Sequence, residues 1–274
     1  MKLIYSLSKR TIEPHSDIVY SFFRISILMA KEAGYQTELW GTSDAIQKLG
    51  DVVDSVVNVD DIEYELYDDI KMKIWETATP NITTIDGDVF LYNKLSLGGL
   101  WLNVDEKFTE LSADGNKCLD SFNEFDIKSI IPEWDSTNKI GLSTGLVNWG
   151  KNDEFKKHYT ESYWKLRRWY LDNQYDIVMK NAFLHNSYPA ISHIICENLL
   201  YQLVREYDIE YKEFSTNPKN LYVHKAGERK YKMGPLYGGI LTLENEIKQR
   251  GGSVTENYNR MVEGGYPPFL YLLE

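Results

Sequence analysis

Two aspartates separated by one residue, Asp86 and Asp88, could bind a divalent metal ion. In an extended strand, residues i and i+2 point to the same side, so both carboxylates would face one way. Two like charges held that close repel each other unless a cation lies between them. Mg²⁺ and Mn²⁺ prefer oxygen ligands and would leave coordination positions for a phosphate. The competing interpretation is a simple turn, because Asp-Gly is a common turn dipeptide.

A second polar stretch follows the apolar residues 221–223. Its nine positions include an imidazole and four cationic side chains: His224, Lys225, Arg229, Lys230 and Lys232. The pattern is His224-x-x-Gly227-x-x-Lys230. An imidazole can complete a metal site begun by carboxylates. Gly227 would let the backbone approach a phosphate, and Lys230 would place a charge beside a leaving diphosphate.

Composition limits the partners and the compartment. The chain of 274 residues carries a net charge of −11, which argues against an extended nucleic-acid-binding surface. Its two cysteines, Cys118 and Cys196, lack a C-x-x-C spacing, so no disulfide framework or zinc site is expected. No apolar run approaches the roughly 18 residues that span a bilayer, and the N-terminus is too short in apolar residues for a signal peptide. We expect a soluble cytoplasmic protein.

The order of predicted elements indicates an α/β fold with a mostly parallel sheet, because strands and helices alternate from the first residues. The predicted strands are 2–7, 36–40, 52–59, a strand after Pro80 that carries the aspartates, 140–149, 211–214 and 221–223. The predicted helices are 18–33, a short helix ending at Gly50, 70–78, 153–171, 191–207 and 236–248. The acidic stretch 60–69 is expected to be solvated, 93–140 has no clear pattern, and the tail from Gly251 is expected to wrap the surface.

Position favours a functional role for the two aspartates. They lie near the carboxyl end of a predicted parallel strand, which is where open α/β sheets bind ligands. Together with the basic stretch downstream, this placement favours a metal site over a turn.

The two motifs resemble those of GT-A glycosyltransferases. Residues 85–90 are similar to the D-x-D strand of that group. His224-x-x-Gly227-x-x-Lys230 resembles the H-x-x-G-x-x-K motif of the family 8 retaining enzymes, such as glycogenin and bacterial lipopolysaccharide galactosyltransferases. The resemblance implies that Asp86, Asp88 and His224 bind Mn²⁺ (or Mg²⁺) and that the metal holds the diphosphate of a nucleotide sugar, usually UDP. The family continues with Pro-Trp where this chain has Tyr231 and Lys232.

Weaker likenesses suggest further contacts to the donor. Residues 141–148 are similar to the strand that lines the donor sugar, Glu197 resembles an acidic helix start near the reacting centre, and Lys73 precedes the D-x-D as a basic donor contact does. The predicted catalytic residues are Glu197, Asp88 and Lys230. The predicted donor-binding residues are Tyr5, Ser6, Lys73, Asp86, Gly87, Ser143, Thr144, Gly145, Gly227 and Lys230.

The sequence therefore predicts a GT-A (Rossmann-like) fold, a single domain with a C-terminal extension. Residues 1–235 would form the nucleotide-sugar transferase domain, and residues 236–274 a helix and tail packed on it. The expected activity is metal-dependent transfer of a sugar, with retention, from a nucleotide sugar to an acceptor that no motif defines.

Three other functions remain open. Gly141-x-Ser143-x-Gly145 fits the nucleophile elbow of an α/β-hydrolase-like esterase, with Asp176 or Asp208 and His224 following in the required order. Residues 147–152 are poor helix sequence, however, and the elbow needs a helix there. A haloacid-type phosphatase would need Thr or Val where Phe90 stands. A non-catalytic nucleotide-sugar-binding protein is the third alternative. The chain has no P-loop and no G-x-G-x-x-G.

Overall fold

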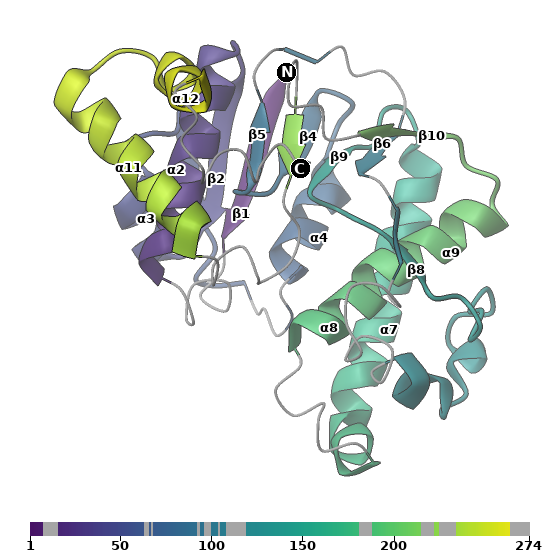
Figure 1. Ribbon diagram of the computed structural model, residues 1–274. Coiled ribbons are helices and arrows are strands. Elements are labelled where there is room, and N and C mark those ends of the chain that lie inside the picture. The colour runs from purple at the N-terminus through teal and green to yellow at the C-terminus, as the bar shows by residue number, and fades with distance from the viewer. Residues whose placement is uncertain are drawn as a thin grey trace.

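The computed structural model describes residues 1–7, 16–62, 66, 68–91, 94–95, 100–103, 105–107, 119–180, 188–214, 222–224 and 234–263. Within these residues the main sheet has seven strands in the order β10-β6-β9-β4-β1-β2-β3 (Figure 1). Their bounds are β1 Lys2–Leu7, β2 Gln36–Gly41, β3 Ser55–Asn58, β4 Ile82–Ile85, β6 Leu100–Asn103, β9 Leu146–Asn148 and β10 Tyr211–Phe214. Only β9 runs antiparallel to its neighbours, β4 and β6. The predicted mixed, mostly parallel α/β sheet is confirmed.

Two small sheets and the helices complete the described chain. β5 (Val89–Leu91) pairs with β11 (Tyr222–His224), and β7 (Asp105–Lys107) pairs with β8 (Ile140–Leu142). The helices are α2 Ser16–Glu32, α3 Ser43–Leu49, α4 Asp69–Thr77, the 3-10 turn η1 Ile127–Ser129, α7 Asp153–Lys180, α8 Tyr188–His193, the π-helical turn η3 Ile194–Asn198, α9 Leu199–Glu206, α11 Gly234–Arg250 and α12 Val254–Glu263. No helix in this part of the chain combines the length and apolar character needed to cross a membrane.

Side-chain alternation along β1 sets the two faces of the sheet. Leu3, Tyr5 and Leu7 share one face and pack in a core with α2 and α3. Ile4 points to the opposite face and packs against Ile70 of α4. Because side chains in a strand alternate with a period of two, an almost fully apolar strand such as β1 must be covered on both faces.

A second core joins α4 to the helices that follow β9. The core buries Trp75 of α4, Tyr159 of α7 and Trp149, which follows β9. The indole rings of Trp75 and Trp149 meet edge to face with their centroids 5.2 Å apart. α7 extends from the expected 153 to Lys180, beyond the predicted end at 171. This aromatic core packs α7, α8 and α9 against α4 and the residue that follows β9, Trp149.

The C-terminal helices cover the outer side of α2 (Figure 1). Phe22 and Met29 of α2 pack with Leu243 of α11 and Tyr258 of α12. Within the predicted tail from Gly251, residues 254–263 form α12. Gly251 and Gly252, which precede it, adopt positive φ (65° and 88°) and make the turn into the helix. The domain boundary at residue 235 stays a prediction.

Candidate functional site

The D-x-D residues form a turn at the carboxyl end of β4, not a continuous strand. The Val89 amide donates to the Asp86 carbonyl (3.1 Å), and the Asp86 amide donates to the Gly145 carbonyl (2.7 Å). The expectation of an extended chain was therefore wrong, because the backbone reverses between β4 and β5. The Asp86 side chain is 32% exposed, whereas Asp88 is buried.

Gly87 is required at this turn by its packing against α2. A Cβ atom at position 87 would lie 2.1 Å from Cδ2 of Phe23, far inside van der Waals contact. The helix thus presses directly on the backbone between the two aspartates. Only a residue without a side chain fits without moving the turn or the ring.

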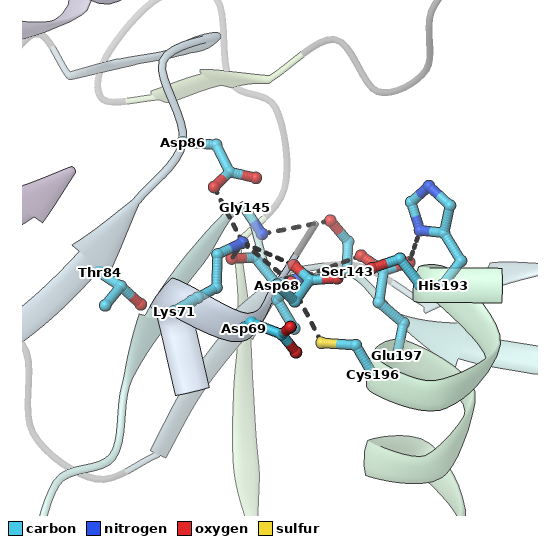
Figure 2. A network of polar contacts seen from close by, with 12 residues as sticks. Asp68, Asp69, Lys71, Thr84, Asp86, Ser143, Gly145, His193, Cys196 and Glu197 are labelled. Carbon is cyan, nitrogen blue, oxygen red and sulfur yellow. Dashed lines mark hydrogen bonds and ion pairs between the residues drawn. The ribbon is translucent and has the colours of Figure 1, made fainter. Parts of the chain in front are cut away.

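A buried lysine, Lys71 of α4, reaches the first aspartate. Its ammonium lies 2.9 Å from Asp86 Oδ1 and donates to the carbonyl and the hydroxyl of Thr144, both at 3.2 Å (Figure 2). Burial by itself would lower the pKa of the ammonium, but the attraction of Asp86 and then Asp68 outweighs it and raises the pKa. Lys71 is therefore a charged group at neutral pH. It links the D-x-D turn to the chain segment 143–145.

Two members of the acidic stretch 60–69 are buried, so the expectation of a solvated run was wrong for them. Asp68 accepts from the Ser192 hydroxyl (2.6 Å) and lies 3.6 Å from the Lys71 ammonium. Burial raises the pKa of the Asp68 carboxyl despite the attraction of Lys71. Asp69 accepts from the Tyr163 hydroxyl and from Arg167 Nε, both at 2.8 Å.

Both oxygens of the Glu197 carboxylate are engaged. Oε1 accepts from the Thr144 amide (3.1 Å), and Oε2 lies 2.7 Å from His193 Nδ1. Burial would raise the pKa of Glu197, but attraction to His193, the hydrogen bond with His193 and the Thr144 amide together hold it below its ordinary range. Glu197 therefore remains a carboxylate and anchors the segment 143–145 from the side opposite Lys71 (Figure 2).

The predicted strand 140–149 is two strands in different sheets, β8 and β9, joined by Ser143, Thr144 and Gly145. This geometry contradicts the hydrolase alternative. A nucleophile elbow needs a helix directly after the serine, but β9 follows Gly145. Ser143 is 4% exposed, and its hydroxyl accepts from the Gly145 amide at 3.4 Å.

Three predicted donor-binding residues belong to β1 and α4. Tyr5 is fully buried, and its hydroxyl lies 3.1 Å from the Ser26 hydroxyl of α2. Ser6 is half-buried near the carboxyl end of β1, one residue beyond the part that pairs with β4. Lys73 pairs with Glu76 (3.0 Å) and lies over the Trp164 ring. The lysine of α4 that reaches the D-x-D is thus Lys71, two positions earlier.

Backbone pairing brings the second motif to the first. β11 runs antiparallel to β5, and its register sets His224 opposite Val89, the residue after Asp88. Val89 and His224 are 135 positions apart in the sequence, but the two motifs are adjacent in the fold. The side chain of His224, and all of Gly227 and Lys230, lie outside the described part of the structure.

The described carboxylates are compatible with a divalent ion but do not make a complete site. Among the side chains that the structure describes, no three His, Cys, Asp or Glu residues are grouped to hold a metal. Asp86 pairs with Lys71 through Oδ1 and is partly exposed, which leaves an oxygen donor of the kind that Mn²⁺ and Mg²⁺ accept. The third predicted ligand is His224.

Sequence reasoning missed Lys71, Asp68 and His193. A signal for Lys71 exists in the helical spacing: position 71 lies one turn after Asp68 and between the buried residues Ile70 and Met72. Lys73 falls on the other side of the same helix. His193 lies four positions before Glu197, so both share one helix face.

No protein-family model and no curated protein sequence matches this chain. A solved structure of the galactosyltransferase LgtC in complex with donor and acceptor sugar analogues is similar over 79% of this chain and 74% of that chain. The TM-score is 0.37 and the sequence identity is 8%. A likeness at this level does not establish a common fold or a common activity.

Proposed function

We propose that this protein is a metal-dependent glycosyltransferase that moves a sugar, with retention, from a nucleotide sugar (UDP-linked) to an acceptor. One observation carries the proposal: β11 pairs with β5 so that the first residue of the His-x-x-Gly-x-x-Lys motif lies opposite the residue after Asp88. This pairing brings the two sequence motifs together, as a shared metal site would require.

The position of the turn supports the same activity. It follows the carboxyl end of β4, which is parallel to β1. Crevices beyond the carboxyl ends of parallel strands are the usual ligand sites of open α/β sheets. Asp86 is partly exposed there, and its charge is balanced by Lys71.

The proposed reaction breaks the bond between the anomeric carbon and the diphosphate, which leaves negative charge on a phosphate oxygen. A metal ion held by Asp86, Asp88 and His224 would supply Lewis-acid stabilisation of that charge. Lys71 would hold the Asp86 side chain in place through their ion pair, and Lys230 would contact the diphosphate. The acceptor hydroxyl would attack the anomeric carbon on the same face that the diphosphate leaves, and its proton would pass to the oxygen of the leaving diphosphate.

The test is ligand-dependent stability followed by turnover. Mn²⁺ together with UDP should stabilise the protein by about 2.7 kcal/mol when the free ligand is at about 100 times its dissociation constant. Asp88→Asn should abolish this shift, because the metal loses a charged oxygen ligand. Asp44→Asn, an exposed aspartate of α3, is the matched control and should keep it.

Stabilisation by UDP that needs no metal, or that survives Asp88→Asn, would contradict the proposal. A screen of nucleotide sugars for metal-dependent release of UDP then separates an enzyme from a nucleotide-sugar-binding protein, which would bind without turnover. The anomeric configuration of the product, read by NMR, tests retention.

A further inference from the structure

We infer that Glu197 is a positioning residue: held by His193, it fixes the segment 143–145, which in turn fixes Asp86. The inference rests on the proposed function for its catalytic meaning, because Asp86 is a proposed metal ligand. The geometry itself does not depend on that function. Three connections carry it, and each is a direct contact between described atoms.

The first connection runs from Glu197 to the backbone of Thr144. The carboxylate accepts the Thr144 amide at 3.1 Å in a site where Glu197 is 6% and Thr144 is 2% exposed. A charged acceptor that is shielded from solvent forms a stronger hydrogen bond than a neutral acceptor. It holds the amide of a residue that belongs to neither β8 nor β9.

The second connection runs from the segment 143–145 to Asp86 by two routes. The Gly145 carbonyl accepts the Asp86 amide at 2.7 Å, so the backbone of the turn is tied directly to the segment. The Thr144 carbonyl and hydroxyl accept from Lys71, whose ammonium is paired with the Asp86 carboxylate. The main chain and the side chain of Asp86 therefore both depend on where Thr144 and Gly145 lie.

The third connection holds Glu197 itself. His193 Nδ1 lies 2.7 Å from Oε2, one helical turn before Glu197. Glu197 itself lies in the π-helical turn η3 between α8 and α9, which begins directly after His193. Such a turn inserts an extra residue and redirects side chains, and it is often found at functional sites. Figure 2 shows Glu197 pointing from this turn toward the segment 143–145, with His193 on its outer side.

These contacts distinguish positioning from direct chemistry. Glu197 is 6% exposed and both of its oxygens already contact groups of the protein, which is the arrangement expected of a positioning residue. Glutamine at position 197 could keep both contacts, because its amide oxygen accepts from Thr144 and its amide nitrogen can donate to the other tautomer of His193. A chemical role would be lost in Glu197→Gln, whereas a positioning role would be retained.

The experiment compares Glu197→Ala and Glu197→Gln in the full chain by amide hydrogen exchange and by UDP affinity in the presence of Mn²⁺. In Glu197→Ala, the amides of Thr144 and Asp86 should exchange at least about 10-fold faster, since a hydrogen bond to a charged group is lost. The dissociation constant for UDP should rise by a similar factor. In Glu197→Gln, both quantities should stay within about 3-fold of the wild type.

Glu38→Ala is the matched control. Glu38 is also a nearly buried carboxylate, hydrogen-bonded to Lys2, Trp40 and Ser55, but it lies on β2 away from the turn. Its loss should leave exchange at Thr144 and Asp86 unchanged. Unchanged exchange in Glu197→Ala would overturn the inference, as would a Glu197→Gln protein that binds UDP and exchanges normally but has no turnover. If the wild type does not bind UDP, the proposed function fails while the exchange comparison still decides the positioning role.

Discussion

The ammonium group of Lys71 makes three contacts in the candidate site. It neutralises Asp86, lies near Asp68 and holds Thr144. A positive charge beside a proposed metal ligand weakens the pull of that ligand on a divalent ion, but it also removes repulsion from an incoming diphosphate. Under the proposed function, Lys71 would therefore favour a metal that arrives together with the nucleotide over a metal that binds alone.

Replacing Lys71 with methionine keeps the length of the side chain and removes its charge. Asp68 would then be buried near Glu197 without its ion pair to Lys71, and breaking a buried pair costs about 3–5 kcal/mol. We expect the lower part of that range, because Asp86 is 32% exposed and can be solvated. Urea denaturation at pH 7 measures the change.

Lys73→Met on the same helix is the control. Lys73 is 42% exposed, and its pair with Glu76 should contribute no more than about 1 kcal/mol. Equal losses of unfolding free energy in the two variants would mean that the buried ion pairs of Lys71 contribute no more to stability than the exposed pair of Lys73.

The turn between β4 and β5 shows how an element constrains a site. Phe23 of α2 packs on Gly87, so the helix and the turn fix each other's position. This contact should also hold the two aspartates on either side of Gly87 in place, which a loop exposed to solvent would not do.

Gly87→Ala should destabilise the protein by about 1–3 kcal/mol, because the added methyl group overpacks the contact with Phe23. It should also weaken binding of Mn²⁺ with UDP, since the turn must shift. Combining it with Phe23→Leu should cost less than the sum of the two single changes, because the shorter side chain gives room for the methyl group. Additive losses in thermal or urea unfolding would show that the two residues do not press on each other.

The elements that the sequence predicted well have locally determined patterns. β1, β2, α2 and α4 follow from alternation or helical spacing within one segment. The D-x-D turn, the division of 140–149 into two strands and the π-helical turn at Glu197 depend on partners far along the chain. The Gly145 carbonyl, for example, accepts the Asp86 amide, and Thr144 is tied to Glu197. The two residues of each of these pairs are more than 50 positions apart, so no short stretch of sequence contains both.

The candidate site was predicted in part for the same reason. Asp86 and His224 were proposed from short motifs in the sequence, and the structure places the His224 backbone beside Val89, close to the D-x-D turn. The burial of Asp68 was missed because its partner Ser192 lies 124 residues away, and an isolated acidic run looks like a solvated surface.

For the whole molecule, the C-terminal helices are fastened to the first helix. Glu32, the last residue of α2, accepts from the Ser253 hydroxyl and from the amides of Val254 and Thr255 at the start of α12. Burial would raise the pKa of Glu32, but the bonds from Thr255, Val254 and Ser253 outweigh it and lower the pKa. A carboxylate is also favoured at a helix N-terminus by the helix dipole.

The lowered pKa of Glu32 determines how the stability of α12 changes with pH. A carboxyl group whose pKa is lowered by folding contributes fully above its unfolded value, about 4.3 for glutamate, and loses that contribution as the pH falls through the folded value. Glu32→Ala should destabilise α12 by about 1 kcal/mol at pH 7, and the difference from the wild type should shrink below about pH 4.

Hydrogen exchange in 254–263 as a function of pH measures this contribution. Glu256→Ala is the control, because that carboxylate is on the first turn of the same helix but is exposed. A difference between Glu32→Ala and the wild type that stays constant down to pH 3 would exclude an ionised cap.

The pairing of β11 with β5 also has a consequence for biosynthesis. Val89 and His224 are neighbours in the sheet, but 135 residues separate them along the chain. At a translation rate of roughly 5–20 residues per second, Val89 would leave the ribosome about 7–27 s before its partner strand. During that interval the nascent chain carries the two aspartates without the histidine motif. If the proposed metal and nucleotide site exists, it would therefore be completed only after most of the chain has been made.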